Sequence, residues 1–283
     1  MSTNLTLCTA ALDVLQTTKA TDKAHKTRAH AKSWQDKEIT TIGQATPPER
    51  PARPERPELK HPFDMPARGK AGSTRAKIAL FHALAHIELN AIDLAWDIIA
   101  RFSNLAQENQ ANTESFTLPV EFYEDWLKVA DDEAKHFLML EERLNDFGAS
   151  YGDLPAHDGL WEASERTAHD FAARLAIVPM VLEARGLDVT PAMIETMKKQ
   201  NDDKTVNMLQ IIHDDEITHV RAGTLWFEYW CKFYGHDVQD YWQELVKTYF
   251  KGRLKRPFNH PSRHEAGMIR DWYEPLADID WNE

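Results

Sequence analysis

Two five-residue stretches decide the fold: residues 132–136 are Asp-Glu-Ala-Lys-His, and residues 215–219 are Asp-Glu-Ile-Thr-His. Residues three apart on an α-helix lie on the same face. Each Glu-x-x-His unit can therefore offer a carboxylate oxygen and an imidazole nitrogen to one metal ion. A four-helix carboxylate centre for two metal ions needs two such units and one further Glu from each of two other helices. The spacing predicts that both stretches are helical and that a helical bundle brings them together.

Two other glutamates stand in the required chain order. Glu88 lies in the apolar stretch HALAHIELNAIDLAWD before the first unit, and Glu183 lies in ARLAIVPMVLEARGLD between the two units. A carboxylate on a buried apolar face is costly unless it is paired or bound to a metal ion. His82, His86 and Asp93 compete with Glu88 for the ligand position, and we expect the two histidines to pack or form hydrogen bonds nearby instead. The alternative for Glu183 is a surface side chain paired with Arg185.

Oxygen ligands with one imidazole per metal suit iron or manganese better than thiol-seeking metals. We therefore predict two bound metal ions, iron with manganese as the alternative, whose charge four carboxylates would balance. The predicted metal ligands are Glu88, Glu133, His136, Glu183, Glu216 and His219.

Three further side chains are predicted to lie directly behind these ligands. A ligating imidazole usually donates its other N–H group to a carboxylate. Asp132 could serve His219 in this way, and Asp215 could serve His136. An ordinary surface Asp is an equal alternative at both positions. His86 is the third residue of this group.

Composition restricts the class of protein. The chain has 283 residues, a formal net charge of -12 and 42% hydrophobic residues. The acidic balance argues against broad nucleic-acid binding, and two cysteines, Cys8 and Cys231, argue against a disulfide framework or a thiolate metal site. No stretch approaches the roughly 20 apolar residues of a membrane span. Without a basic-then-apolar signal pattern at the N-terminus, we expect a cytoplasmic location.

The N-terminal part differs in composition from the rest. Residues 4–17 have apolar positions at helical spacing, and residues 19–32 are a second helix or a solvated basic arm. Residues 47–66 hold too many prolines for a helix or sheet interior and are expected to be extended. Leu59, Phe63 and Met65 are candidate apolar anchors, which favours a strap packed through its C-terminal half. We therefore expect an arm and strap over residues 1–66 and a helical body over residues 67–283.

Four long helical patterns follow, without a convincing strand, so the predicted fold is all-α. They alternate between a lone Glu and Glu-x-x-His, which is the plan of a ferritin-like four-helix bundle. Ser73 or Thr74 is the expected N-cap of the first pattern, and Gly148, Gly186 and Gly235 are expected to end the other three. The predicted elements are long helices over 73–102, 119–147, 160–185 and 202–234, short helices over 190–199 and 238–251, and an irregular tail over 252–283.

Several long stretches also carry a family resemblance. RPARPERPEL, ALFHALAHIELNAIDLAWD, VADDEAKHF, YGDLPAHDGLW, ARLAIVPMVLEARGLDVTP, DDEITHV and PFNHPSR together resemble the DUF455 family of ferritin-like proteins. The resemblance covers nearly the whole chain and implies a ferritin-like four-helix bundle with a di-metal site at the six predicted ligands. The implied bundle is similar in plan to that of di-iron oxygenases such as the tRNA-hydroxylating enzymes of the ferritin-like superfamily. This similarity is an analogy at the level of the fold.

The predicted function is that of a non-haem di-iron oxidoreductase, which activates dioxygen to oxidise or hydroxylate a small organic substrate. One alternative is iron or manganese handling with ferroxidase or peroxide-scavenging chemistry, and another is a binding protein with a structural metal. The sequence leaves the substrate and the electron donor open, keeps a tRNA substrate as an option, and is compatible with a homodimer.

Overall fold

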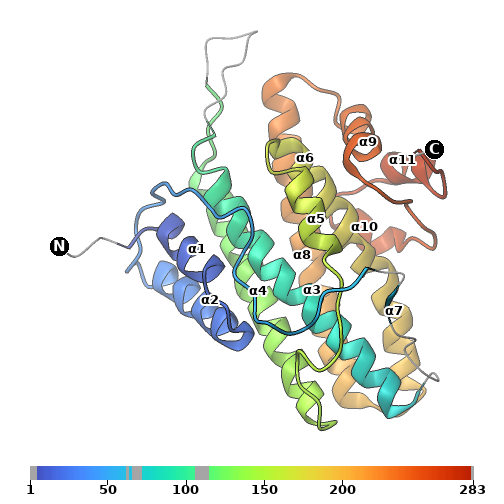
Figure 1. Cartoon of the computed structure of the whole chain (residues 1–283). Coiled ribbons are helices and arrows are strands. Elements are labelled where there is room, and N and C mark those ends of the chain that lie inside the picture. Colours follow the sequence, from blue (N-terminus) through green and yellow to red (C-terminus); the bar gives the residue numbers. More distant parts are fainter. Residues whose placement is uncertain (1–4, 62–63, 66–71, 106–114, 282–283) are drawn as a thin grey trace. The chain divides into compact units, whose positions relative to one another are not determined.

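The computed structural model describes residues 5–61, 64–65, 72–105 and 115–281 (Figure 1). These residues form helices and two isolated β-bridges, without a β-strand among them. The all-α prediction is confirmed. The chain forms two compact units, namely unit 1 (Met1–Gln107 and Thr117–Trp161) and unit 2 (Glu108–Phe116 and Glu162–Glu283). The expected division at residue 66 stays a prediction.

Unit 1 is built on two long helices that pack along each other. Ser73 accepts a hydrogen bond from the Ala76 amide and so caps the first of them, as predicted. The N-terminal helices cover this pair, because α1 packs on α3 and α2 packs on α4. The helices of unit 1 are α1 (Leu7–Leu15), α2 (Ala20–Gln35), α3 (Thr74–Arg101) and α4 (Val120–Asn145), followed by the start of α5 (Gly159–Arg166).

Helix α3 is the core helix of unit 1. Among the described residues it is the one helix that is long and apolar enough to cross a membrane by length and composition alone. However, 67% of its most apolar 18-residue window is buried inside the protein. Its apolar character is therefore that of a buried core helix.

Helix α2 is more than a solvated basic arm, because one of its lysines is fully buried. The Lys23 ammonium lies 2.5 Å from the Asp93 carboxylate on α3 and donates to the Ala52 carbonyl at 2.9 Å. Arg53 lies 2.8 Å from the same carboxylate. Burial lowers the pKa of Lys23. A buried cluster of three charges thus joins α2, α3 and the proline-rich strap.

The strap packs through its middle, and the predicted apolar anchors are wrong where they can be checked. Leu59 is 47% exposed, Met65 is partly exposed, and Phe63 lies outside the described residues. The buried strap residues are Pro51 and Pro57 instead. The reason is that polar contacts hold the strap, such as the ion pair of Arg53 with the Asp93 carboxylate on α3, whereas the expectation considered apolar side chains alone.

Unit 2 contains one long helix surrounded by shorter ones. Asp202 caps the long helix α8 by accepting from the Thr205 amide. Gly235 ends the helix in the left-handed conformation at φ 75°, as expected of a glycine stop. The helices of unit 2, after the end of α5, are α6 (Phe171–Ile177), the π-helix η2 (Val178–Glu183), α7 (Ala184–Lys198), α8 (Asp203–Tyr234), α9 (Val238–Tyr249), α10 (His260–Glu265), α11 (Arg270–Tyr273) and the 3₁₀-helix η3 (Glu274–Leu276).

The predicted helix over 160–185 begins where expected, with α5 at Gly159, but its continuity and its end are wrong. The chain leaves the helical path after Arg166 and starts again at α6, where the Asp170 carboxylate accepts from the Ala173 amide as an N-cap. At the other end, Gly186 does not stop the helix, and α7 continues through it and through Pro191 to Lys198. The expected separate helix over 190–199 is therefore the second half of α7.

The tail after residue 252 is less irregular than predicted. It contains α10, α11 and η3, and α10 packs against α7 and α8. Asn259 caps α10 by accepting from the Ser262 amide. The tail is thus a folded part of unit 2.

Candidate metal centre

Unit 1 brings three of the predicted ligands together. Glu88 of α3 and the pair Glu133 and His136 of α4 each present one ligand atom, and these atoms lie within 4.8 Å of one another. His136 Nδ1 lies 3.5 Å from Glu88 Oε2 and 3.5 Å from Glu133 Oε2. All three side chains are buried. This set of ligand atoms could hold a metal ion.

Electrostatics favours a cation among these side chains. Burial, and then the neighbouring Glu133 carboxylate, raise the pKa of Glu88 from its ordinary 4.5 to about 8. Two carboxylates in a buried site repel each other when both are ionised. A divalent cation would remove this repulsion and favour the ionised form of Glu88. The donor set therefore fits a metal ion electrostatically.

The distances fit as well. Two donor atoms that each lie about 2.1 Å from one ion, at the angles of tetrahedral or octahedral geometry, are roughly 3.0–3.4 Å apart. The two distances from His136 Nδ1 are 3.5 Å. They are longer than the usual 2.7–3.2 Å of a hydrogen bond from nitrogen to oxygen. Small side-chain movements would therefore suffice to place all three donors around one ion.

His86, predicted to lie behind the ligands, uses both ring nitrogens elsewhere. Nε2 lies 3.1 Å from the His157 carbonyl, and Nδ1 lies 2.7 Å from the Tyr151 hydroxyl. A carbonyl can only accept, so Nε2 carries the proton and Nδ1 accepts from Tyr151. Burial, followed by the charge of Arg53, lowers the pKa of His86 to about 3. His86 therefore stays neutral and fastens the loop after α4 to α3.

The carboxylate before the first Glu-x-x-His unit is held by two lysines. Asp132 lies 2.5 Å from Lys128 Nζ and 2.9 Å from Lys135 Nζ, both on its own helix. These contacts fix the carboxylate on the α4 surface next to Glu133. The expected role of Asp132 in orienting a ligating histidine stays a prediction, and so does that of Asp215.

Unit 2 contains the second set of predicted ligands. Glu216 and His219 stand one turn apart on α8, with His219 Nδ1 3.8 Å from Glu216 Oε2. Glu183 is the last residue of η2, whose end is marked by an i→i−5 bond from the Ala184 amide to the Pro179 carbonyl. π-Helical turns are rare and are often found at functional sites. η2 packs against α8.

A glycine allows this contact between η2 and α8. A Cβ atom added to Gly223 would lie 2.5 Å from the Cβ and Cγ atoms of Pro179, closer than carbon atoms can approach. Gly223 stands four residues after His219, one turn along the same helix. The turn that carries Glu183 therefore packs directly on the backbone of the helix that carries the other two predicted ligands.

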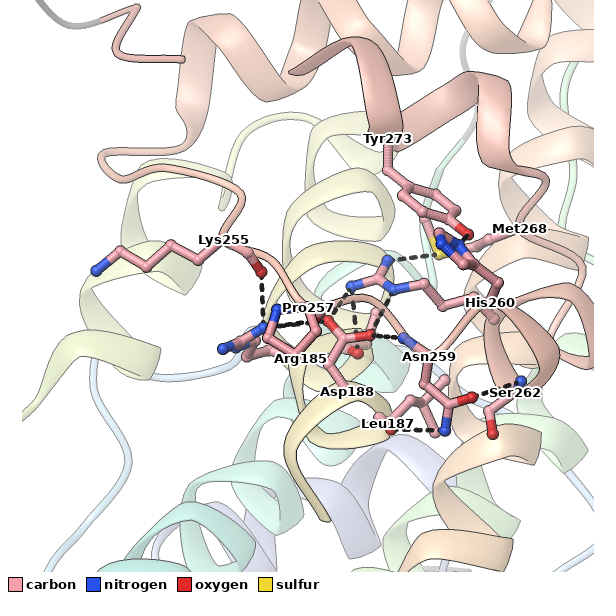
Figure 2. A network of polar contacts seen from close by, with 12 residues as sticks. Arg185, Leu187, Asp188, Lys255, Pro257, Asn259, His260, Ser262, Met268 and Tyr273 are labelled. Atoms are coloured by element: carbon pink, nitrogen blue, oxygen red, sulfur yellow. Dashed lines mark hydrogen bonds and ion pairs between the residues drawn. The ribbon is translucent and has the colours of Figure 1, made fainter. Parts of the chain in front are cut away.

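Sequence reasoning missed a polar network that holds α7 just after Glu183 (Figure 2). Asp188 is buried and receives two hydrogen bonds from the Arg263 guanidinium, at 2.8 and 2.7 Å. Arg185, the partner of Glu183 in the alternative interpretation, donates to the tail carbonyls of Lys255 and Pro257. Arg263 belongs to the stretch PFNHPSR, whose polar residues were the available signal.

Comparison with known proteins adds a family but no activity. Residues 16–274 match the family described as "Protein of unknown function (DUF455)". An uncharacterized protein of Haemophilus influenzae is 40% identical over 230 residues, which is 81% of this chain and 75% of that protein. No solved structure matches the chain significantly.

Proposed function

The chain belongs to the DUF455 family, and we propose that it is a ferritin-like protein whose two sets of ligands bind two metal ions and support oxidation chemistry. The observation that carries the proposal is the buried set of Glu88, Glu133 and His136 in unit 1. Such a set is costly in a protein core unless a cation balances it.

The predicted ligands in unit 2 support the proposal of a second metal ion. Its predicted ligands, Glu183, Glu216 and His219, repeat the chemical composition of the set in unit 1. Each set has two carboxylates and one imidazole, so each can balance one divalent ion. Counted together, the ligands of the two sets have the composition of the di-iron and di-manganese carboxylate centres of helical bundles.

The donor set favours iron or manganese, because it consists of oxygens and imidazole nitrogens without a thiolate. A pair of such ions would supply two electrons for the reduction of dioxygen. Burial by α3 and α4 would keep bulk water from Glu133 and His136. We propose a small organic molecule as the substrate and a cytoplasmic location for the reaction.

Metal analysis tests the proposal directly. Protein purified without added metal should contain close to two ions per chain, and the double variant Glu133→Ala/Glu216→Ala should lose most of them while its helix content persists. The matched control is Glu124→Ala/Glu228→Ala, which removes two other carboxylates from the same helices. Unchanged metal content in the first double variant would contradict the proposal.

Reaction with dioxygen separates oxidation chemistry from metal handling. The protein loaded with Fe(II) without air should consume about one dioxygen per two-metal centre and then stop until a reductant is added. Continued oxidation of many irons per chain would instead indicate metal handling. Absence of any reaction with dioxygen or peroxide would indicate a structural metal.

A further inference from the structure

One short segment of the C-terminal tail, residues 257–268, which we call the clasp, contacts two long helices of unit 2, and Figure 2 shows its contacts with α7. The clasp includes α10, which packs on α7 and on α8. α7 begins directly after Glu183, and α8 carries Glu216 and His219. The contacts of the clasp with these helices lie close in sequence to the predicted ligands on each side.

The strongest contact is made by Arg263. Its guanidinium forms a two-pronged pair with Asp188, and the side chains of both residues are almost completely buried. The same guanidinium lies 3.4 Å from the carbonyl of Ala184, the residue that follows Glu183. A pair of this kind has a defined geometry as well as a favourable energy. Arg263 therefore fixes the first turn of α7, from the end of the π-helix to Asp188.

Asn259 supplies a hydrogen bond that the backbone of the same helix lacks. In an α-helix the Leu187 carbonyl would accept from the amide four residues later, but that residue is Pro191, which has no N–H group. The Asn259 side-chain amide donates to this carbonyl at 3.1 Å. The tail thus supplies the hydrogen bond that the proline removes, which explains how α7 can continue through Pro191.

The clasp also holds α8 on both sides of its Glu-x-x-His unit. Ser262 Oγ lies 3.4 Å from Nε2 of His213, which stands three residues before Glu216. Farther along the helix, the Thr224 hydroxyl donates to the Ala266 carbonyl at 2.6 Å. One folded segment therefore joins α7 and α8 at several points around the predicted ligands.

We propose that Asn259 and Arg263 are positioning residues for the metal ligands of unit 2. By fixing α7 against α8, they determine where the Glu183 carboxylate lies relative to Glu216 and His219. The inference rests on the proposed function, because it assigns these three side chains to a metal centre. It adds a contribution from a tail segment that follows the last ligand by 40 residues or more in the sequence.

The first experiment uses the double-mutant cycle of Asn259→Ser and Pro191→Ala. Serine keeps the N-cap of α10, since Ser and Asn are equally good caps, but it is too short to reach Leu187. We expect Asn259→Ser to weaken binding of one metal ion about tenfold, the lower end of the range for groups behind a ligand. The substitution Pro191→Ala supplies the missing backbone amide, so it should restore most of the affinity that Asn259→Ser loses. Asn207→Ser on α8 is the control.

Two readouts are needed for each variant. Competition with a chelator measures the affinity for Mn(II), and hydrogen exchange of the metal-free protein measures the protection of the α7 amides. Faster exchange in α7 together with weaker Mn(II) binding, both reversed by Pro191→Ala, is the expected result. Faster exchange with unchanged Mn(II) affinity would overturn the positioning role, because the clasp would then stabilise unit 2 without affecting the ligands.

A second variant tests the same idea through Arg263. Arg263→Lys keeps the charge but cannot form the two-pronged pair, and Arg256→Lys is the control within the tail. We expect weaker Mn(II) binding for Arg263→Lys alone, and equal affinity of both variants would overturn the role of Arg263. If the wild-type protein binds no Mn(II) at all, the proposed function fails instead. The exchange data then still show whether the clasp fixes α7.

Discussion

The contact between η2 and α8 predicts that replacing a glycine by alanine changes the free energy of unfolding in opposite directions at two positions in unit 2. In Gly223→Ala, the new Cβ would meet Pro179 at 2.5 Å, whereas in Gly186→Ala it would meet nothing within 4 Å. Both glycines stand inside helices. The helix propensity gained on replacing Gly by Ala is therefore similar at the two positions, and the steric contact is the main difference.

The magnitude follows from the distances. Carbon atoms in contact lie about 3.5–4.0 Å apart, so η2 must move about 1 Å away from α8 to admit the methyl group that Gly223→Ala adds. Overpacking of this kind costs typically 1–3 kcal/mol, and Ala recovers about 1 kcal/mol of helix propensity. Because the Pro179 ring cannot rotate away from the new methyl group, the cost lies in the upper part of this range, about 2–3 kcal/mol, and we expect Gly223→Ala to lower the free energy of unfolding by about 1–2 kcal/mol. Gly186→Ala should raise it by up to about 1 kcal/mol.

Urea denaturation followed by circular dichroism measures the free energies of unfolding, and chelator competition measures the metal affinity of the same samples. Binding sites need their groups held within about 0.5 Å of the productive geometry. Gly223→Ala should therefore also weaken metal binding, since it moves the turn that carries Glu183, while Gly186→Ala should leave it unchanged. If Gly223→Ala proves as stable and binds metal as well as the wild type, the close contact with Pro179 is refuted.

Two further predictions concern unit 1. Asp93→Asn leaves the buried charges of Lys23 and Arg53 without their carboxylate and should lower the free energy of unfolding by about 3–5 kcal/mol, measured by urea denaturation; a loss below about 1 kcal/mol would show that the cluster is not buried in solution. Burial lowers the pKa of His82 below its ordinary 6.5, so its contribution to stability is complete above pH 6.5 and is lost as the pH falls through the lowered value. His82→Gln keeps an acceptor for the Gly152 amide, and the melting temperature of this variant should fall less than that of the wild type between pH 7 and pH 4. An equal fall in melting temperature for the two proteins would contradict the role of His82 in this pH dependence.

The helices that could be predicted from the sequence are those whose ends are set locally. Ser73, Asp202 and Gly235 stand at the positions that caps and left-handed stops require, and the structure uses all three. The first Glu-x-x-His unit and Glu88 could be predicted because they depend on helical spacing and on an apolar surrounding. Their burial together in unit 1 follows from the contact between α3 and α4.

The errors arose where a distant residue overrides a local signal. Gly186 and Pro191 indicate a helix end, but the hydrogen bond that lets α7 continue comes from Asn259, 72 residues after Leu187. Leu59 was expected to anchor the strap, but the strap is held by charges, among them the pair of Arg53 with Asp93, 40 residues apart. Local pattern rules contain no information on such pairs.

Two departures from local rules remain even with the distant contacts in place, and both involve predicted metal ligands. Glu88 is a buried carboxylate beside a second buried carboxylate, and Glu183 ends a π-helical turn. Natural proteins keep such departures mainly at functional sites, because elsewhere they only lower stability. The structure compensates for the second with Gly223 and with the Arg263–Asp188 pair on either side of Glu183. A surface glutamate at the end of a helix would need neither of these contacts, which supports the proposal that Glu183 is a metal ligand.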